Sequence, residues 1–294
     1  MTIKKDRLAL VIILIIITGV ILGYLAEGRT NTKPAADKIG VVVSIGPEAE
    51  FVKAVGGDKV DVTVMVPSTA DVHTYEPLPS ELSAVANARM YVELGSSVEF
   101  ETNYMDKLKA SNPSMLIVNA SKGIDFIANT AEGDNQTVDS HVWMSPRNAK
   151  IMVENIYEGL VQIDPDNQDY YQKNKEQYQQ KLDELDENTT ELLKDKKKPI
   201  LIYHPAFGYY ARDYNLSMVG AMVNDEEPSP QRIAMMVDLA REYNITVVYL
   251  EPQYDPKFMN TIASQINGQI LTVSDMDEHY LDNMEKVALA FSRS

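Results

Sequence analysis

The segment DPDNQDYYQKNKEQYQQKLDELDENTTELLKDKKKP, residues 164–199, divides this chain into two similar halves. Asp164 is a typical helix N-cap, Pro165 suits a first turn, and Pro199 ends the pattern. Its sparse apolar side chains fall roughly on one helical face: Tyr171, Tyr178, Leu182, Leu185 and Leu192. We therefore predict a linker helix over residues 164–197. At ~1.5 Å per residue it would span roughly 45 Å and act as a stiff strut.

On both sides of this segment, short β-branched runs alternate with helix-like stretches. Such alternation is typical of parallel sheets covered by helices on both faces. We predict an α/β fold of two lobes, residues 38–163 and 198–294, each with a four-stranded, mainly parallel sheet flanked by helices. The expected strands are residues 41–45, 60–66, 90–94 and 115–119 in the first lobe, and 200–203, 218–221, 246–250 and 270–273 in the second.

The N-terminal segment differs in composition from the two predicted lobes. Lys4, Lys5 and Arg7 precede residues 8–26, which carry no charge and are long enough to cross a bilayer as a helix. The basic flank places this end in the cytoplasm and the remaining chain outside. We predict an N-terminal transmembrane helix within residues 1–26, followed by a polar spacer over residues 27–37. A cleaved signal, which would leave the protein secreted or periplasmic, is the alternative.

Composition narrows the chemistry that the chain can perform. It has no cysteine, which excludes disulfides, thiolate metal ligands and a lipidated cysteine. The net charge is −16, which argues against nucleic acid as a partner and favours cationic ligands. Any metal site must therefore use nitrogen and oxygen ligands. We expect the folded body to be a monomer.

The chain has only four histidines, and three of them lie in short loops where strands meet helices. His204 directly follows a predicted strand, and ligands of open α/β sheets bind outside the carboxyl ends of strands. His73, His141 and Asp275 occupy comparable loops. A lone histidine beside a strand is commonly structural, but three histidines and an aspartate in such loops, two residues from each lobe, predict one metal site in the cleft between the lobes. The fourth histidine, His279, lies in a polar helix start, and we expect it to be exposed.

Five phrases give the chain a family resemblance. They are VPSTADVHTYEPLPSEL (residues 66–82), DSHVWMSPRNA (139–149), YHPAFGYYARDYNL (203–216), EEPSPQRIAMMVDLARE (226–242) and EPQYDPKFMNTIASQINGQILTVSD (251–275). The body resembles the extracytoplasmic solute-binding proteins that feed zinc or manganese to ABC transporters, in the cluster with a rigid helical linker. The lipid-bearing cysteine and the histidine-rich loop of many members are missing here.

The resemblance implies a ligand set and a partner. His73, His141 and His204 match the family's three ligand positions, and Asp275 matches the carboxylate after the last strand. Histidine at the third position is typical of zinc-type members, whereas manganese-type members often have glutamate there. The implied partner is an ABC transporter permease, reached from the extracytoplasmic face of the cell membrane.

Three imidazoles and one carboxylate form a closed tetrahedral shell, which favours Zn²⁺ over Mn²⁺ or Fe²⁺. We expect the affinity to fall as pH drops through imidazole titration near ~6.5. Polar neighbours must fix each imidazole tautomer, and Glu76, Glu251 and Ser145 are candidates. We also expect the linker helix to limit lobe closure, so that metal binding orders loops instead of swinging a lobe.

Other functions remain open at this point. A manganese- or iron-binding importer component would use the same fold, as would a surface adhesin or metal chaperone. A zinc hydrolase needs an open coordination position, which Asp275 would close. The chain also has no HExxH motif and no Gly-x-Ser-x-Gly elbow. We therefore expect no enzymatic activity.

Overall fold

The computed structural model describes residues 38–128, 138–223 and 226–293, and its folded body forms one compact unit beginning at Lys38. The predicted anchor and spacer, residues 1–37, lie outside the described residues. Among the helices of the described part, none combines the length and apolar character needed to cross a membrane.

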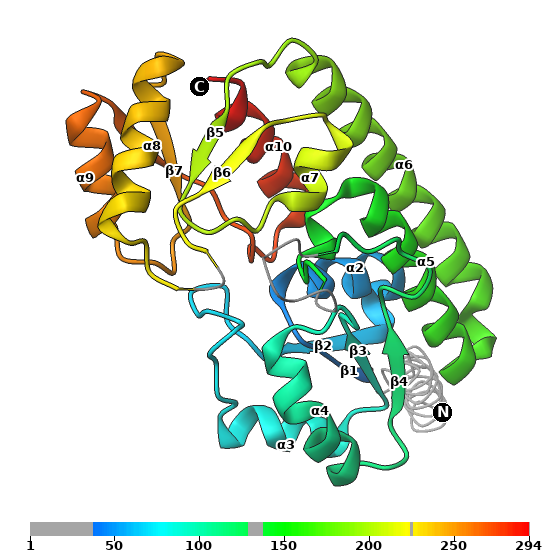
Figure 1. Ribbon diagram of the computed structural model, residues 1–294. Helices are drawn as coiled ribbons and strands as arrows, with labels where there is room; N and C mark the ends of the chain where they lie inside the picture. The colour runs from blue at the N-terminus through cyan, green and yellow to red at the C-terminus, as the bar shows by residue number, and fades with distance from the viewer. Residues whose placement is uncertain (1–37, 129–137, 224–225, 294) are drawn as a thin grey trace, which may run out of the picture. The chain divides into compact units, whose positions relative to one another are not determined.

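The first lobe contains a four-stranded parallel sheet with the order β2-β1-β3-β4. Helices α2 and α5 pack together and against this sheet, whereas α3 packs beside α4 (Figure 1). The strands are β1 (Ile39–Val43), β2 (Val60–Val64), β3 (Met90–Glu93) and β4 (Leu116–Asn119), and the helices are α2 (Gly46–Gly56), α3 (Pro79–Asn87), α4 (Glu99–Ser111) and α5 (Pro146–Ile163).

The second lobe repeats this topology, with the order β6-β5-β7-β8 and parallel pairing throughout. Its strands are β5 (Ile200–Ile202), β6 (Met218–Gly220), β7 (Val247–Leu250) and β8 (Gln269–Thr272), and its helices are α7 (Gly208–Asp213), α8 (Pro230–Glu242), α9 (Lys257–Gln265) and α10 (Tyr280–Ser292). The predicted α/β fold of two four-stranded lobes is confirmed. The strand order switches from one side to the other between β1 and β3 and between β5 and β7, and open α/β sheets bind ligands at such a switch point.

Local sequence explains where the helices begin. Pro146 and Pro230 occupy first-turn positions, and Ser145 and Ser229 each accept a hydrogen bond from a backbone N–H of the first turn. Both are standard N-terminal signals, because a first-turn proline loses no helical hydrogen bond and a serine oxygen pairs with an otherwise unbonded N–H.

The long helix α6 (Gln168–Leu193) follows a 3₁₀ turn, Pro165–Asn167. Asp164 therefore precedes that turn instead of capping α6, and its carboxylate accepts a hydrogen bond from the Tyr171 hydroxyl at 2.6 Å. The predicted apolar face is buried apart from Leu192, which is 43% exposed, whereas Leu193 is buried. At ~100° per residue, Leu192 falls at the edge of the buried stripe. The prediction that Leu192 belongs to the apolar face was therefore wrong.

Helix α6 packs against α2 and α5 of the first lobe and against α10 of the second (Figure 1). Tyr178 illustrates this contact, since its ring lies 6.1 Å from that of Phe51 and its hydroxyl donates to Glu50 at 2.6 Å. The helix is therefore packed along its length onto both lobes.

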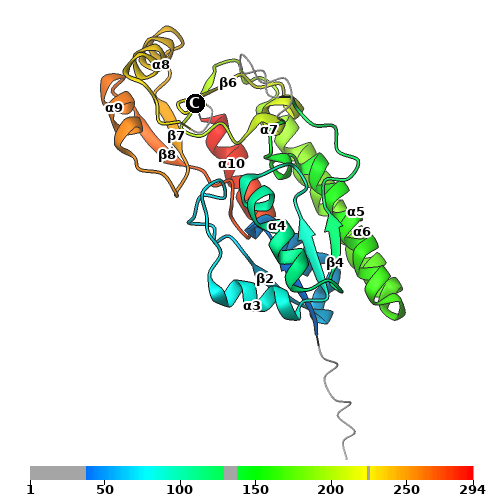
Figure 2. The same ribbon diagram turned by 60° about the horizontal axis from the view of Figure 1, so that its bottom comes forward.

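The hydrophobic core is continuous from one lobe to the other. Phe51 of α2 lies edge-on to Tyr280 of α10, with ring centroids 4.8 Å apart, and the Tyr280 hydroxyl donates to the Trp143 carbonyl at 2.8 Å. Helices α8 and α9 cover the other face of the second sheet (Figure 2). A second, smaller core lies beneath them. Strand β5 serves both, because Ile200 and Ile202 face the large core and Leu201 faces the small one.

Candidate metal centre

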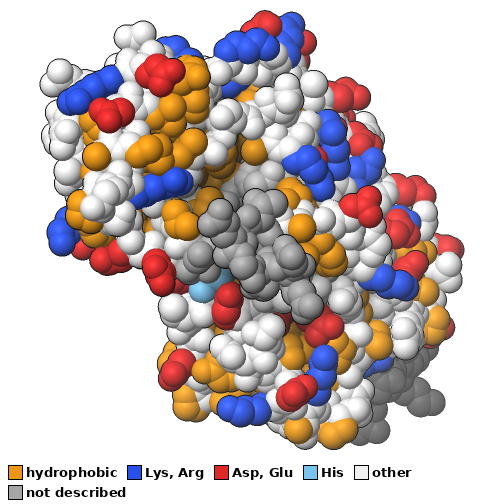
Figure 3. Space-filling model, viewed as in Figure 1, with side chains coloured by type: hydrophobic (Ala, Val, Ile, Leu, Met, Phe, Trp, Pro, Cys, Tyr) orange, Lys and Arg blue, Asp and Glu red, His pale blue; other side chains and the backbone are white. Residues whose placement is uncertain are grey.

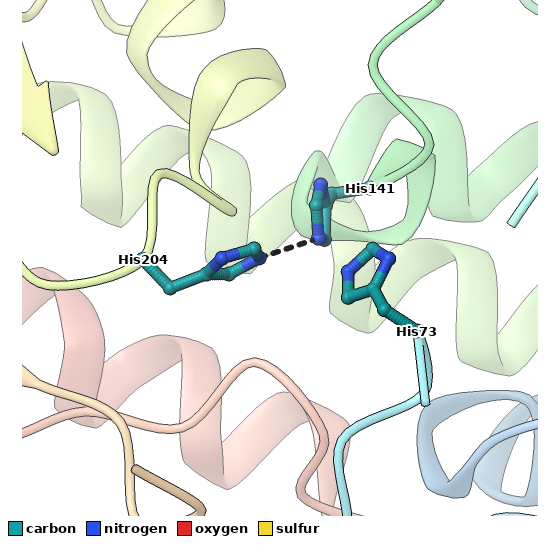
Figure 4. A group of neighbouring side chains, drawn as sticks. All are labelled: His73, His141 and His204. Carbon is teal, nitrogen blue, oxygen red and sulfur yellow. Dashed lines mark hydrogen bonds between the residues drawn. The ribbon is translucent and has the colours of Figure 1, made fainter. Parts of the chain in front are cut away.

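Three histidines from three loops converge where the lobes meet. His73 follows β2, His141 precedes the 3₁₀ turn Val142–Met144, and His204 follows β5. One ring nitrogen from each lies within 4.8 Å of the others. The ring centroids are 5.4 Å apart for His73–His141 and His73–His204, and 4.9 Å apart for His141–His204. Figure 4 shows the three rings turned toward a common point.

Two of these histidines are placed by the same local turn. The backbone N–H of His73 donates to Asp71 Oδ1, and that of His141 donates to Asp139 Oδ1, both at 2.9 Å. An aspartate that accepts from the backbone two residues later fixes a compact turn. Each loop therefore presents its histidine with little freedom of the main chain.

Carboxylates also contact the rings of these two histidines. His73 Nδ1 lies 2.5 Å from Glu99 Oε2, and His141 Nδ1 lies 2.8 Å from Asp139 Oδ1. The hydrogen bond with His73 is the largest cause of the lowered pKa of Glu99. Because an ionised carboxylate only accepts, Nδ1 carries the proton in a neutral ring and the lone pair lies on Nε2. These carboxylates thus select the tautomer that binds a metal through Nε2.

His204 is the most buried of the three, at 2% exposed. Burial lowers its pKa well below the ordinary value, with further contributions from His141 and His73, so the neutral, ligating form is favoured. Its Nε2 lies 3.0 Å from His141 Nε2, drawn as the dashed line in Figure 4. Two imidazole nitrogens this close are stabilised by a shared proton or cation. Tetrahedral zinc with Zn–N bonds of ~2.0–2.1 Å separates its nitrogens by about 3.3 Å.

Asp275 lies in the loop after β8 and is buried at 4% exposed, but it is not part of the group of three close ring nitrogens. Burial raises its pKa, opposed by a hydrogen bond from Gln253 and by the charges of His141 and His73. Its carboxylate therefore lies within electrostatic range of two of the three histidines. Its backbone carbonyl accepts from Trp143 Nε1 at 2.6 Å.

His279 is separate from this site, as predicted. Its side chain is 72% exposed, and its ring nitrogen lies 3.3 Å from Asp277. Figure 3, which colours side chains by type, shows histidine surface beside acidic side chains where the lobes meet.

The rings of His73 and His141 contact residues other than the candidates named from the sequence. Glu76 is exposed, and Ser145 caps α5 and bonds Asp213. Glu251 supports His204 through the backbone, since it accepts from the His204 N–H at 3.2 Å. Glu99 and Asp139 contact the rings instead.

The sequence carried a partial signal for this arrangement. An aspartate stands two residues before His73, His141 and His279 alike, and all three pairs form the same backbone turn. Because the exposed His279 shares it, the Asp-x-His pattern indicates a turn and not a metal site. Glu99 lies 26 residues from His73, so no local pattern could have paired them.

The chain is similar to a known family and to several of its members. The family described as "Zinc-uptake complex component A periplasmic" matches residues 41–294. The high-affinity zinc uptake system protein ZnuA of Bacillus subtilis is 33% identical over 287 residues, covering 90% of this chain and 88% of that protein. The manganese ABC transporter substrate-binding lipoprotein PsaA of Streptococcus anginosus is 28% identical over 268 residues, covering 86% of each.

A crystal structure of ZnuA superposes with a TM-score of 0.83 at 32% identity, covering 88% of this chain and 99% of that one. The resemblance drawn from the five sequence phrases is confirmed. The chain therefore belongs to the family of zinc-uptake complex component A periplasmic proteins.

Proposed function

We propose that this protein captures a divalent transition metal, foremost Zn²⁺, outside the cytoplasm and delivers it to an ABC importer. One observation carries the proposal: three imidazoles from both lobes bring their nitrogens within 4.8 Å of one another. Neutral imidazole is the commonest protein ligand for such ions. The zinc and manganese relatives support the same role for this chain.

The proposed ligands are Nε2 of His73, His141 and His204, with Asp275 as the fourth. Asp275 would bind the ion as an ionised carboxylate, because the positive charge offsets the burial that raises the pKa of this group. Three nitrogens and one oxygen suit zinc better than manganese, which prefers more oxygen ligands. Manganese remains the second candidate, since one relative is named for it.

Capture, not catalysis, follows from this shell, because four protein ligands leave no position for an activated water. Delivery requires a permease, and family membership supports an ABC transporter permease as the partner. The proposed location is the extracytoplasmic face of the cell membrane. The apolar residues 8–26 would provide the anchor, since the chain has no cysteine to carry a lipid. We further propose that the body acts as a monomer.

Zinc titration of paired histidine variants tests the metal site. We expect His204→Ala to lower the zinc affinity by at least about 100-fold, because it removes a ligand and opens the shell. The matched control is His279→Ala, whose exposed side chain lies outside the group and should leave the affinity unchanged. Competition against a chelating dye measures both. Equal losses in the two variants, or none in either, would overturn the proposed site.

Delivery is tested in cells. Loss of the gene should reduce uptake of radioactive zinc, and the unaltered protein or His279→Ala should restore uptake whereas His204→Ala should not. Restoration by His204→Ala would contradict a transport role for this site.

A further inference from the structure

The carboxylate of Asp275 is held by a residue outside the proposed ligand set. Gln253, in the loop after β7, donates through Nε2 to Asp275 Oδ1 at 3.0 Å. The Trp143 indole donates to the backbone carbonyl of Asp275 at 2.6 Å. Asp275 is therefore fixed at its main chain and at one oxygen of its side chain.

Gln253 is itself placed at an energetic cost. Its Oε1 is buried and has no hydrogen-bond partner within the part of the chain that the structure describes. Buried polar atoms without partners are rare and are concentrated at sites where another requirement fixes the side chain. Here the amide is oriented with its NH₂ group on Asp275.

We propose that Gln253 is a specificity-determining positioning residue, which keeps Asp275 Oδ1 hydrogen-bonded so that only Oδ2 coordinates the metal. This inference rests on the proposed function and on Asp275 as the fourth ligand. One carboxylate oxygen and three imidazole nitrogens give four-coordinate geometry, which zinc adopts in closed protein sites. Manganese prefers six ligands with more oxygen, and a carboxylate that binds through both oxygens moves the shell toward that number. Gln253 thereby favours zinc over manganese.

The test replaces the amide without emptying its space. Gln253→Met has similar volume and no N–H donor, so it frees Asp275 Oδ1. The zinc and manganese affinities are measured by dye competition, and the zinc coordination number by X-ray absorption. We expect the ratio of zinc to manganese affinity to fall about tenfold or more, and the coordination number to rise from four toward five. Gln231→Ala, on the exposed start of α8, is the control and should change neither quantity.

A double mutant establishes that the effect passes through Asp275. In an Asp275→Ala background, Gln253→Met should leave the metal ratio unchanged, because there is no carboxylate to release. An unchanged ratio in Gln253→Met alone, or coordination by both Asp275 oxygens in the unaltered protein, overturns the inference. Gln253→Ala replaces Gln253→Met if the latter does not fold. The X-ray absorption spectrum of the unaltered protein gives the zinc coordination number without any variant.

The two proposals fail in different ways. If the unaltered protein binds neither metal, the proposed function fails. If it binds zinc through the three histidines while its metal ratio is indifferent to Gln253, only this inference fails.

Discussion

At the scale of single residues, one aspartate orders both the backbone and the ring of His141. Asp139 Oδ1 accepts from the His141 N–H at 2.9 Å and contacts the ring Nδ1 at 2.8 Å. The turn aims the side chain, and the ring contact selects the tautomer. An amide at this position could keep part of the turn but would lose the charge that holds the Nδ1 proton.

Asp139→Asn should therefore lower the zinc affinity by about 10- to 100-fold, the usual effect of altering a partner of a metal-binding histidine. Asp277→Asn is the matched control, because Asp277 makes the same turn with the exposed His279. Dye competition at pH 7.5 measures both affinities. Equal affinities for Asp139→Asn and the unaltered protein would show that the carboxylate does not tune the ligand.

A second residue-scale feature lies inside the first lobe, where two carboxylates are buried near each other. Glu48 accepts from the backbone N–H groups of Ser44 and Ile45, and Glu101 accepts from those of Leu94 and Gly95. Burial raises the pKa of Glu48 well above its ordinary value, with Glu101 adding to the effect. Burial also raises the pKa of Glu101 to about 7. The folded protein thus favours protonated forms of both groups.

A raised folded pKa means that the folded state binds more protons than the unfolded state. The stability that this extra proton binding contributes is fully present below pH ~4.5. It is lost as pH rises through the pKa of the folded state, which for Glu101 is about 7. Glu48→Gln keeps an oxygen for the two N–H groups and removes one titration. We expect it to leave stability at pH 5 nearly unchanged and to raise the free energy of unfolding at pH 8 by about 1–3 kcal/mol.

Urea unfolding at the two pH values measures this difference. Glu285→Gln, on the exposed face of α10, is the control and should shift neither value. A Glu48→Gln variant that is less stable than the unaltered protein at pH 8 would contradict the prediction.

At the scale of elements, α6 combines an exposed polar surface with a buried stripe. The buried residues follow steps of three and four: Tyr171, Lys175, Tyr178, Leu182, Leu185, Thr189 and Leu193. Lys175 lies within this stripe because its amine pairs with Glu154 at 2.9 Å and lies 4.1 Å from the centre of the Tyr157 ring. The stripe attaches the linker to both lobes, so the stability of α6 comes from packing more than from its sequence propensity.

Leu182→Ala should destabilise the folded body by about 2–5 kcal/mol, because it removes a fully buried side chain from the junction of α6 with its neighbours. Leu192→Ala, at the last residue but one of α6 and 43% exposed, should cost about 0.5 kcal/mol or less. Denaturant unfolding measures both. Similar costs for the two variants would show that the stripe does not contribute in this way.

At the scale of the whole molecule, the two lobes share one core. Phe51 meets Tyr280, and Trp143 bonds both Tyr280 and Asp275 across the junction. Gly46 is also a close contact between lobes, since a Cβ there would lie 2.7 Å from the Met276 carbonyl oxygen. Opening the lobes would expose this apolar surface, which opposes large hinge motion.

We therefore expect zinc to leave the radius of gyration within error of its zinc-free value, while protecting the loops around His73 and His141 from hydrogen exchange. Small-angle scattering and exchange mass spectrometry measure the two effects. A clear decrease in radius on adding zinc would contradict the shared-core argument.

The order and type of the elements were determined by the sequence itself, because short β-branched runs and helix-start residues such as Ser145 and Pro146 act locally. The three histidine loops were also predictable, since each follows a strand or precedes a helix in a recognisable phrase. Tertiary structure decided the rest. Glu99 on His73, Gln253 on Asp275 and the joined cores of the two lobes connect residues distant in sequence. Such contacts depend on how whole sheets and helices pack, and no periodic pattern encodes that packing.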